Sequence, residues 1–263
     1  MDFGNKNIWI TGAASGMGRA LAVELSACNA CLILSDRDES GLKETLTMLN
    51  PACKAHHLVL DMSDSASIEA AVARILSDFK TIHALYQFAG ISQRSRVMDT
   101  PLENDRKIME INFFGVITLA KAILPSMVEA GWGHLAVTSS IVGKFGFPFR
   151  SAYSASKHAL HGFFESLRAE YGNVNIRVSI LIPGRVQTNI SKFALDKDGR
   201  EYGKMDPGQA NGITVQKAAR QIVKGLKKEQ KEIKVGGSEL LMLPIRRFFP
   251  ALLYRLVTKI KAV

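Results

Sequence analysis

Tyr153 and Lys157 have the residue types and the spacing of a proton-transfer pair, four residues apart in the stretch YSASK. Residues at this spacing on a helix share one face with Cβ atoms about 5–6 Å apart, so the ammonium can lie beside the phenol. Tyrosine, with a pKa near 10, is a poor base at neutral pH. A cation about 4 Å away at an effective dielectric constant near 20 supplies roughly 3–4 kcal/mol, enough to lower that pKa by about two or three units. The pair therefore predicts a phenol that takes and returns protons.

A glycine-rich turn, TGAASGMG, follows an apolar run near the N-terminus and precedes a helical pattern. Such a turn lets the backbone approach a pyrophosphate, which then faces the N-terminus of the helix. Asp36 ends the next apolar run, 20 residues beyond Gly16, where an acid accepts hydrogen bonds from an adenosine ribose. Asp36 disfavours a 2′-phosphate, whereas the adjacent Arg37 attracts one. We therefore expect NAD as the cofactor, with NADP as the alternative, and a simple helix cap as the other interpretation of Asp36.

Short apolar runs rich in β-branched residues alternate with helical patterns, which is the order typical of a parallel sheet. The expected strands are NIWIT, CLILS, AHHLVL, IHALYQFAG, HLAVTSS, IRVSILIP and IKVGG. The expected helices begin near Gly16, Glu39, Asp64 and Thr214, and two more cover about 101–129 and 151–171. We expect residues 1–263 to form a single-domain Rossmann-type α/β fold, with a doubly wound parallel sheet of about seven strands and helices on both faces. Ligands bind at the carboxyl ends of the strands in such sheets.

Composition narrows the class of protein. The chain has 263 residues, of which 47% are hydrophobic, and can bury a full core. Cys28, Cys31 and Cys53 are an odd set without metal-type spacing, so we expect buried free thiols in a reducing compartment. No secretory signal is expected at the N-terminus, so we expect a cytoplasmic location. The net charge is +10, but no nucleic-acid-binding motif accompanies it, and the histidines form no ligand set, so we expect neither a nucleic-acid partner nor a metal.

The glycine turn, Asn112, Ser140 and YSASK together resemble the short-chain dehydrogenase/reductase family over residues 7 to about 235. The stretch from Ser139 to Glu170 most closely resembles the branch with the 11β-hydroxysteroid dehydrogenases and the DHRS7-type enzymes. The resemblance implies an oxidoreductase that transfers hydride between NAD(H) and a secondary alcohol or ketone on a hydrophobic, steroid-like or lipid-derived substrate. It also implies a homodimer or homotetramer.

The resemblance assigns roles to individual residues. Tyr153 exchanges the substrate proton, Lys157 lowers the pKa of Tyr153 and holds the nicotinamide ribose, and Ser140 hydrogen-bonds the substrate oxygen. Asn112 holds a water that relays protons, although helix bending is an alternative role. Asp61 contacts the adenine, and Val186 and Thr188 lie near the nicotinamide amide. The expected cofactor-binding residues are Gly12, Ser15, Gly16, Met17, Gly18, Asp36, Arg37, Asp61, Met62, Ala89, Gly90, Tyr153, Lys157, Pro183, Val186 and Thr188.

One motif departs from the family pattern. Where NNAG is usual, the chain has Gln87, Phe88, Ala89 and Gly90. The backbone turn is retained, but Phe88 cannot supply the polar contacts of an asparagine. We therefore expect altered cofactor affinity or geometry with the catalytic groups unaffected.

Residues 189–212 interrupt the alternation, because this segment is polar and carries four glycines. A segment after the strand that ends at Pro183 stands over the pocket, and we expect a mobile substrate lid. A solvated surface loop is the alternative. Phe145, Phe147 and Phe149, just before the catalytic helix, either line the pocket or pack in the core.

The last segment, 240–263, is an apolar and basic C-terminal extension that is too short between charges to span a bilayer. After Pro250 it has amphipathic spacing. The apolar positions are Leu252, Leu253, Leu256, Val257 and Ile260, and the basic ones are Arg255, Lys259 and Lys261. Peripheral membrane contact through 245–263 and a helix packed on the protein are both consistent with this pattern.

Three other functions deserve comparison. Ser154 and Lys157 satisfy the S-x-x-K pattern of acyl-transfer enzymes, but no SDN or KTG motif accompanies them. An NADPH-dependent carbonyl reductase is the alternative that Arg37 favours. A non-catalytic dinucleotide-binding regulator would use the same fold without turnover.

Overall fold

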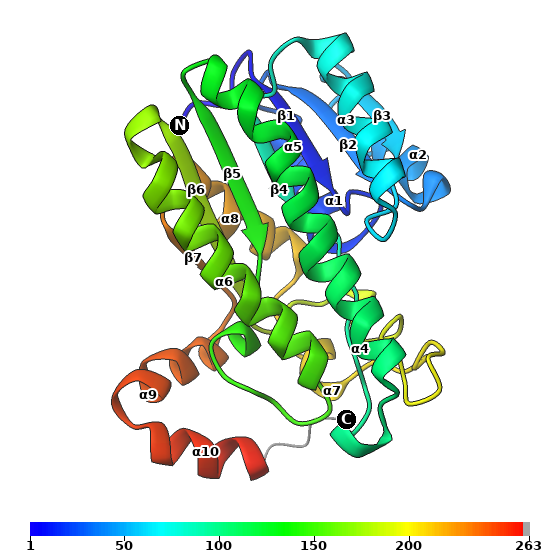
Figure 1. Ribbon diagram of the computed structural model, residues 1–263, viewed down its shortest axis with the longest axis vertical. Coiled ribbons are helices and arrows are strands. Elements are labelled where there is room, and N and C mark those ends of the chain that lie inside the picture. Colours follow the sequence, from blue (N-terminus) through cyan, green and yellow to red (C-terminus); the bar gives the residue numbers. More distant parts are fainter. Residues whose placement is uncertain (260–263) are drawn as a thin grey trace.

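A parallel sheet covered by helices on both faces is the framework of the computed structural model, which describes residues 1–259 (Figure 1). The strands are β1 Asn7–Thr11, β2 Cys31–Asp36, β3 Lys54–Val59, β4 Ala84–Gln87, β5 Gly133–Thr138, β6 Ile176–Pro183 and β7 Glu232–Val235. They lie in the order β3-β2-β1-β4-β5-β6-β7, all parallel. The chain winds outward from β1 to β3 and then returns to β4 beside β1. The predicted doubly wound sheet of seven strands is confirmed.

The helices follow the strands closely. They are α1 Gly16–Leu25, α2 Glu39–Thr47, α3 Ser65–Phe79, α4 Leu102–Met109, α5 Gly115–Glu129, α6 Ser151–Tyr171, α7 Pro207–Ala210, α8 Val215–Lys227, α9 Met242–Phe248 and α10 Pro250–Lys259. Short 3₁₀ turns cover Val97–Asp99, Ile141–Gly143, Gly172–Val174, Asn189–Ser191 and Ser238–Leu241. A π-helical turn, Glu110–Phe114, joins α4 to α5. The expected long helix near 101–129 is therefore continuous but has one widened turn, which is common at functional positions.

Two apolar cores lie on opposite faces of the sheet. Alternate residues of a strand point to opposite faces, so Trp9 packs with α3, α5 and α6, whereas Ile8 and Ile10 pack with α1, α2 and α8. Figure 1 shows α5 and α6 in front of the sheet and α1 and α8 behind it. Every residue of β5 is buried, as expected for a strand covered on both faces.

One helical stretch of the described chain, Leu102–Glu129, is long and apolar enough to cross a membrane by length and composition. Half of its most apolar window is buried inside the protein. Its α5 portion packs against α3. This burial is the pattern of a core helix in a two-faced sheet.

The carboxyl ends of the strands all point toward one end of the molecule, where α4, α7, α9 and α10 also lie (Figure 1). Segments that connect a strand to its following helix therefore meet at this end. These include the expected glycine turn after β1, the connection that begins at Asp36 at the end of β2, and the segment 189–212 after β6. Any site formed by these connections is positioned by the sheet.

Gly115 tests how tightly α5 is packed at this end. A Cβ at Gly115 would lie 2.0 Å from the Met62 carbonyl oxygen, whereas a Cβ at Gly162 on α6 meets nothing within 4 Å. We expect Gly115→Ala to lower the free energy of unfolding by about 1–3 kcal/mol through overpacking. The control, Gly162→Ala, is expected to raise it by about 0.5–1 kcal/mol, because alanine favours helix. Urea unfolding of both variants checks this, and equal stabilities would contradict the close contact.

Candidate active site

The predicted proton-transfer pair lies together on α6. Lys157 is only 4% exposed, and its Nζ donates a hydrogen bond of 2.8 Å to the carbonyl oxygen of Thr138 at the end of β5. The same ammonium lies 5.7 Å from the centre of the Tyr153 ring. The helical spacing therefore brings the two side chains together as expected.

The electrostatics of the pair differ from the expectation. Burial lowers the pKa of Lys157 to about 8. Burial also raises the pKa of the Tyr153 phenol above its ordinary value, and this is opposed by the charge of Arg94, a hydrogen bond with Ser140, and the charge of Arg150. The pKa of the phenol is therefore raised and not lowered, because desolvation is the largest effect and the charges that oppose it come from Arg94 and Arg150. The effect of Lys157 on this pKa stays a prediction.

Ser140 lies two residues after the end of β5, buried beside the phenol. Its hydroxyl oxygen accepts a hydrogen bond of 3.3 Å from the backbone N–H of Val142 at the start of the 3₁₀ turn Ile141–Gly143. Its hydroxyl also lies 3.4 Å from the carbonyl oxygen of Pro183, at the end of β6. Two neighbouring strands thus hold this side chain at the carboxyl end of the sheet.

Asn112 lies in the π-helical turn and is fully buried. Its Oδ1 accepts a 2.8 Å hydrogen bond from the Ile91 N–H, and its Nδ2 donates to the Ile91 carbonyl at 2.9 Å and to Ser156 Oγ at 3.1 Å. The amide therefore ties the connection after β4 to α6. A Cβ at Gly90 would lie 2.9 Å from Asn112 Oδ1, so the contact also requires glycine there. These contacts give Asn112 a structural role between two segments, whereas the proton relay and the helix-bending role both stay predictions.

A cavity of about 430 Å³ opens at the carboxyl ends of β1, β2 and β4. Most of the expected cofactor-binding residues line it. They are Gly12, Ser15, Gly16, Met17, Gly18, Asp36, Arg37, Asp61, Met62, Ala89, Gly90 and Thr188. Tyr153, Pro183 and Val186 line a second cavity instead, and Lys157 is not among the residues that line either one.

The glycine turn provides a backbone cradle for this cavity. Gly12 and Gly16 have φ angles of +70° and +55°, in the region that favours glycine. A Cβ at Gly18 would lie 2.1 Å from the Gly12 carbonyl oxygen. Ser15 and the first residues of α1 line the cavity, so the N-terminus of a ten-residue helix adjoins it. This arrangement fits a pyrophosphate, which both the backbone N–H groups and the helix dipole stabilise.

Two carboxylates stand at strand ends around the same cavity. Asp36 accepts hydrogen bonds of 3.2 Å from the N–H groups of Ala14 and Asp38. The cap of α2 is Asp38, which accepts from the Gly41 N–H at 2.9 Å, so the interpretation of Asp36 as a helix cap is wrong. Hydrogen bonds from Ser63 lower the pKa of Asp61. Both acids are therefore placed to accept hydrogen bonds from a ligand.

Residues 87–90, which differ from the usual NNAG motif, lie at the end of β4. Gln87 is buried, and its side-chain amide has no hydrogen-bond partner among the described residues. Phe88 lines the large cavity and also packs against the apolar core. The motif thus contributes an aromatic surface where the family pattern has an amide.

The second cavity, of about 130 Å³, adjoins the first, because Met17, Thr188 and Ile190 line both. Ser140 and Tyr153 form part of its wall. Its apolar lining includes Ile141, Val142, Phe147 and Met242, and its charged lining includes Arg94, Arg150, Arg185, Asp206 and Glu239. Phe147 therefore lines the pocket, whereas Phe145 packs in the core, so each interpretation of the phenylalanines holds for one residue.

Sequence reasoning missed Arg94, Arg150 and Asp206. Arg94 follows the carboxyl end of β4 and Arg150 immediately precedes α6. Their positions at the binding end of a parallel sheet were a usable signal. Asp206 belongs to the segment expected to be a lid, and only the fold brings it to the arginines.

The two segments that interrupt the sequence pattern both contribute to the second cavity. Ile190, Asp206 and Gln209 come from 189–212, which contains a 3₁₀ turn and α7. Glu239 comes from the 3₁₀ turn before α9, and Met242 is the first residue of α9. In α10, Leu253 is fully buried, which agrees with a helix packed on the protein. Ile260 and Lys261, expected in the same amphipathic pattern, lie outside the described residues.

The remaining sequence candidates are peripheral to the cavities. Cys28, Cys31 and Cys53 are free as expected, but they are half-buried rather than buried. His161, Glu165 and Glu232 bring ligand atoms within 4.8 Å of one another. The Lys144 ammonium already lies 2.6 Å from Glu232 Oε1 and so offsets that acid.

Comparison with known proteins agrees with this geometry. The family model described as short chain dehydrogenase matches residues 6–199. Dehydrogenase/reductase SDR family member 7B of Mus musculus is 39% identical over 259 residues, which cover 96% of this chain and 80% of that protein. Dehydrogenase/reductase SDR family protein 7-like of Drosophila melanogaster is 38% identical over 260 residues, covering 97% and 80%.

Solved structures share the same fold. A short-chain dehydrogenase from Streptomyces avermitilis has a TM-score of 0.80 and 28% identity, and the match covers 96% of this chain and 95% of that one. A short chain dehydrogenase/reductase from Burkholderia phymatum in complex with NAD has a TM-score of 0.84 and 23% identity, covering 96% of each chain. At that lower identity the likeness shows the fold alone.

The buried ammonium of Lys157 makes a pH-dependent prediction. Its pKa falls from 10.5 in the unfolded chain to about 8 in the folded one. Between these values the unfolded chain binds a proton that the folded protein has released, so stability rises with pH. We expect the free energy of unfolding of the wild type, relative to Lys157→Met, to increase by about 3 kcal/mol from pH 8 to pH 10.5. Chemical denaturation across this range measures it, and a constant difference would show that the ammonium is not desolvated.

Proposed function

The chain belongs to the short-chain dehydrogenase/reductase family, and from that membership we propose that it transfers hydride between NAD(H) and a secondary alcohol or ketone on a hydrophobic substrate. The coarser function, an NAD(P)-dependent oxidoreductase, follows from the family and the relatives. The observation that supports the finer proposal is the pair of adjoining cavities. One has the glycine turn and Asp36 in its wall, and the other has Ser140 and Tyr153.

Gly12 and Gly18 leave no room for side chains, because a Cβ at either position would meet neighbouring backbone atoms. The cavity that they line is where we assign the pyrophosphate. When bound, the nicotinamide supplies the group that accepts or gives hydride. We assign Asp36 to the adenosine ribose and Asp61 to the adenine. Val186 and Thr188 lie after β6 where the nicotinamide amide would reach, and the buried Lys157 holds the nicotinamide ribose.

Tyr153 is the proposed proton donor and acceptor. Because burial raises the pKa of its phenol, the side chain is protonated at neutral pH and ready to give a proton to a ketone oxygen. Alcohol oxidation needs the phenolate and is favoured as the pH rises. Ser140, beside the phenol, hydrogen-bonds the same substrate oxygen and stabilises the charge that develops there.

The apolar part of the second cavity supports a hydrophobic substrate. Ile141, Val142 and Phe147 come from the connection between β5 and α6, Ile190 from the 189–212 segment and Met242 from α9. Apolar walls with a few convergent polar groups are typical of small-molecule sites. We propose that 189–212 acts as the substrate lid.

The preference for NAD over NADP depends on two neighbouring residues. The Asp36 carboxylate lines the cavity and repels a 2′-phosphate, whereas the exposed Arg37 lines the same cavity and attracts one. A carboxylate at the strand end accepts the ribose hydroxyls directly, and this favours NAD. An NADPH-dependent carbonyl reductase is the alternative that Arg37 supports.

Peripheral membrane contact is a second proposal, because α9 and α10 carry exposed apolar side chains next to basic ones. Phe248 and Phe249 are 66% and 63% exposed, and Leu252 is 47% exposed. The basic residues of the same helices are Arg246, Arg247, Arg255 and Lys259. Apolar side chains flanked by cations bind anionic lipid surfaces. This contact would place the protein at a membrane surface.

Replacing Tyr153 by Phe tests the proposed enzyme against a non-catalytic regulator. We expect Tyr153→Phe to lower turnover by about 10²-fold or more while leaving cofactor affinity within about twofold, because the phenol oxygen is the proton-transfer group. Turnover is followed by NADH absorbance with a series of hydrophobic secondary alcohols and ketones that begins with cyclohexanol and cyclohexanone. Affinity is followed by fluorescence titration with NADH and with NADPH.

Tighter binding of NADH than of NADPH supports the assignment of Asp36, and the reverse order favours the carbonyl reductase. Unchanged turnover in Tyr153→Phe would exclude the phenol as the acid and base. Tight cofactor binding by the wild type without turnover across the series would favour the regulator.

The membrane proposal is tested by a double substitution that leaves the core unchanged. Truncation at 245 would expose the core around the buried Leu253, so we choose Phe248→Ser with Phe249→Ser. We expect at least a tenfold loss of sedimentation with vesicles that contain phosphatidylglycerol, because each phenylalanine contributes about 1.5–3 kcal/mol on burial. Met98→Ser, which changes a side chain 97% exposed elsewhere, is the control. Equal sedimentation of the wild type and the double variant would contradict membrane contact.

A further inference from the structure

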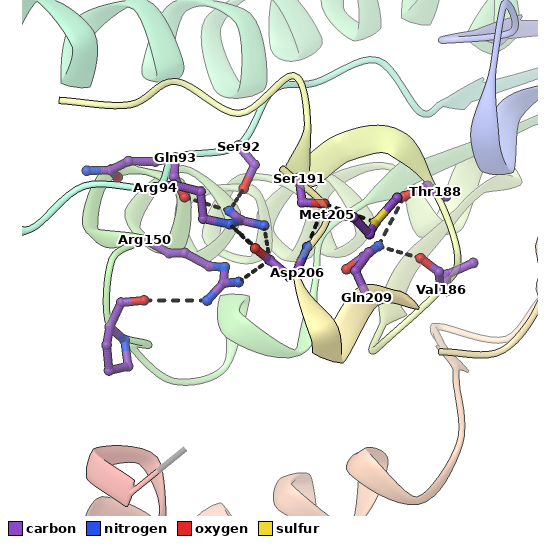
Figure 2. Close-up of polar contacts among 11 residues, drawn as sticks. Ser92, Gln93, Arg94, Arg150, Val186, Thr188, Ser191, Met205, Asp206 and Gln209 are labelled. Atoms are coloured by element: carbon purple, nitrogen blue, oxygen red, sulfur yellow. Dashed lines mark hydrogen bonds and ion pairs between the residues drawn. The ribbon is translucent and has the colours of Figure 1, made fainter. Parts of the chain in front are cut away.

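Two arginines and one carboxylate form a buried charged cluster in the wall of the second cavity (Figure 2). Asp206 Oδ2 lies 2.6 Å from Arg94 Nη2, 2.9 Å from Arg94 Nε and 2.8 Å from Arg150 Nη2. Arg94 Nε also lies 3.1 Å from Asp206 Oδ1. One carboxylate is therefore shared by two guanidinium groups.

The cluster is almost completely removed from water. The exposed fractions of the side chains are 2% for Arg94, 4% for Asp206 and 12% for Arg150. Two further donors of Arg94 are also used, because its Nη1 lies 2.7 Å from Ser92 Oγ and 2.6 Å from the Gln93 carbonyl oxygen. Breaking such a buried pair from one side is strongly destabilising, because a desolvated charge is left uncompensated.

The cluster joins three parts of the chain. Arg94 lies in the connection after β4, Arg150 is the residue that precedes α6, and Asp206 precedes α7 within the 189–212 segment. Backbone hydrogen bonds join the same parts, from Arg94 N–H to the Leu195 carbonyl at 2.7 Å and from Leu195 N–H to the Ser92 carbonyl at 2.9 Å. The segment is thus held to the connection after β4 at two points.

The far end of the segment is held as well. Gln209 Nε2 donates to Thr188 Oγ1 at 3.1 Å and to the Val186 carbonyl oxygen. The Asp206 N–H donates to Ser191 Oγ at 3.3 Å. Figure 2 shows these contacts on one side of Asp206 and the two arginines on the other. Asp206 is the point where the segment meets buried positive charge.

The same arginines line the cavity that Tyr153 lines. Arg150 is three residues before Tyr153, and both Arg94 and Arg150 oppose the effect of burial on its pKa. Lys157 lies near the ring, but its ammonium is directed to the Thr138 carbonyl. The other charged groups of this cavity are Arg185 and Glu239, whose carboxylate accepts from the Arg185 N–H at 2.8 Å.

We propose that Arg94, Arg150 and Asp206 form an electrostatic latch that fastens the 189–212 segment over the cavity and sets the charge that faces Tyr153. The two arginines and Asp206 are positioning residues in this scheme, and Tyr153 is the group on which they act. The importance of this latch for turnover rests on the proposed function. The physical content of the latch, the coupling of the segment to the phenol, is independent of any substrate.

The latch predicts that removing a cation and removing an anion shift the titration midpoint of the Tyr153 phenol in opposite directions. Arg150→Gln removes a cation and should raise the titration midpoint of the Tyr153 phenol by about one pH unit, whereas Asp206→Asn removes an anion and should lower it by a similar amount. Arg150→Lys keeps the charge and should leave the midpoint unchanged. The control is Arg177→Gln, which loses the ion pair of Arg177 with Glu229. Arg177 lies near the start of β6, at the opposite end of that strand from Pro183 and the cavity.

The phenol is titrated by phenolate absorbance after a rapid pH jump, as the difference between each variant and the same variant carrying Tyr153→Phe. A separate measurement, the rate of trypsin cleavage at the exposed Lys197 and Arg200, reports how firmly the 189–212 segment is held. We expect Asp206→Asn and Arg150→Gln to be cleaved at least about tenfold faster than the wild type, because a buried ion pair is lost. Arg177→Gln should be cleaved at the wild-type rate.

Midpoints that move in opposite directions in Arg150→Gln and Asp206→Asn, together with faster cleavage of both, support the latch. Midpoints that stay at the wild-type value or move in the same direction overturn it, because a merely structural cluster gives no sign reversal. Unchanged cleavage also overturns it. Turnover that survives Tyr153→Phe would overturn the proposed function alone, since the phenol titration does not depend on catalysis.

Discussion

Burial of positive charge around a single phenol is the constraint on which the binding end of this molecule depends. Lys157, Arg94 and Arg150 are almost completely removed from water. The Thr138 carbonyl oxygen is the partner of Lys157, and the Asp206 carboxylate is the partner of both arginines. Desolvated cations are tolerated only where such partners are held rigidly. The carboxyl ends of β4 and β5, the start of α6 and the 189–212 segment must therefore stay in register for the charges to remain paired.

The sheet and the glycine turn were predictable because local patterns specify them. Apolar runs with β-branched residues identify buried strands, and the spacing of Tyr153 and Lys157 identifies one helical face. The positive φ angles of Gly12 and Gly16 are likewise a local requirement. The latch was not predictable in this way, because Asp206 lies 112 residues beyond Arg94 and meets it only through the crossover order of the strands. The electrostatics of Tyr153 depend on the same non-local contacts.

The unusual motif at the end of β4 shows how one turn can be held by other means. Gln87 has no partner for its amide among the described residues, and Phe88 supplies only an apolar surface. The following connection is instead held by Asn112, which binds both backbone groups of Ile91. Gln93 adds hydrogen bonds to Ser95, Thr100 and Ser151 and accepts one from the Ala152 N–H. The turn therefore keeps its path without the polar contacts of the usual asparagine.

Packing of the C-terminal helix on the protein and its contact with a membrane are compatible, because α10 has two apolar faces. Leu253 and Val257, four residues apart, pack against the core, whereas Leu252 and Leu256, also four residues apart, are exposed. Each pair shares one side of the helix. Burial of the first pair keeps α10 next to α9, whose Met242 lines the second cavity. A helix anchored in this way can offer its other face to a lipid surface without disturbing the cavity, so membrane contact would place the substrate pocket close to a source of apolar molecules.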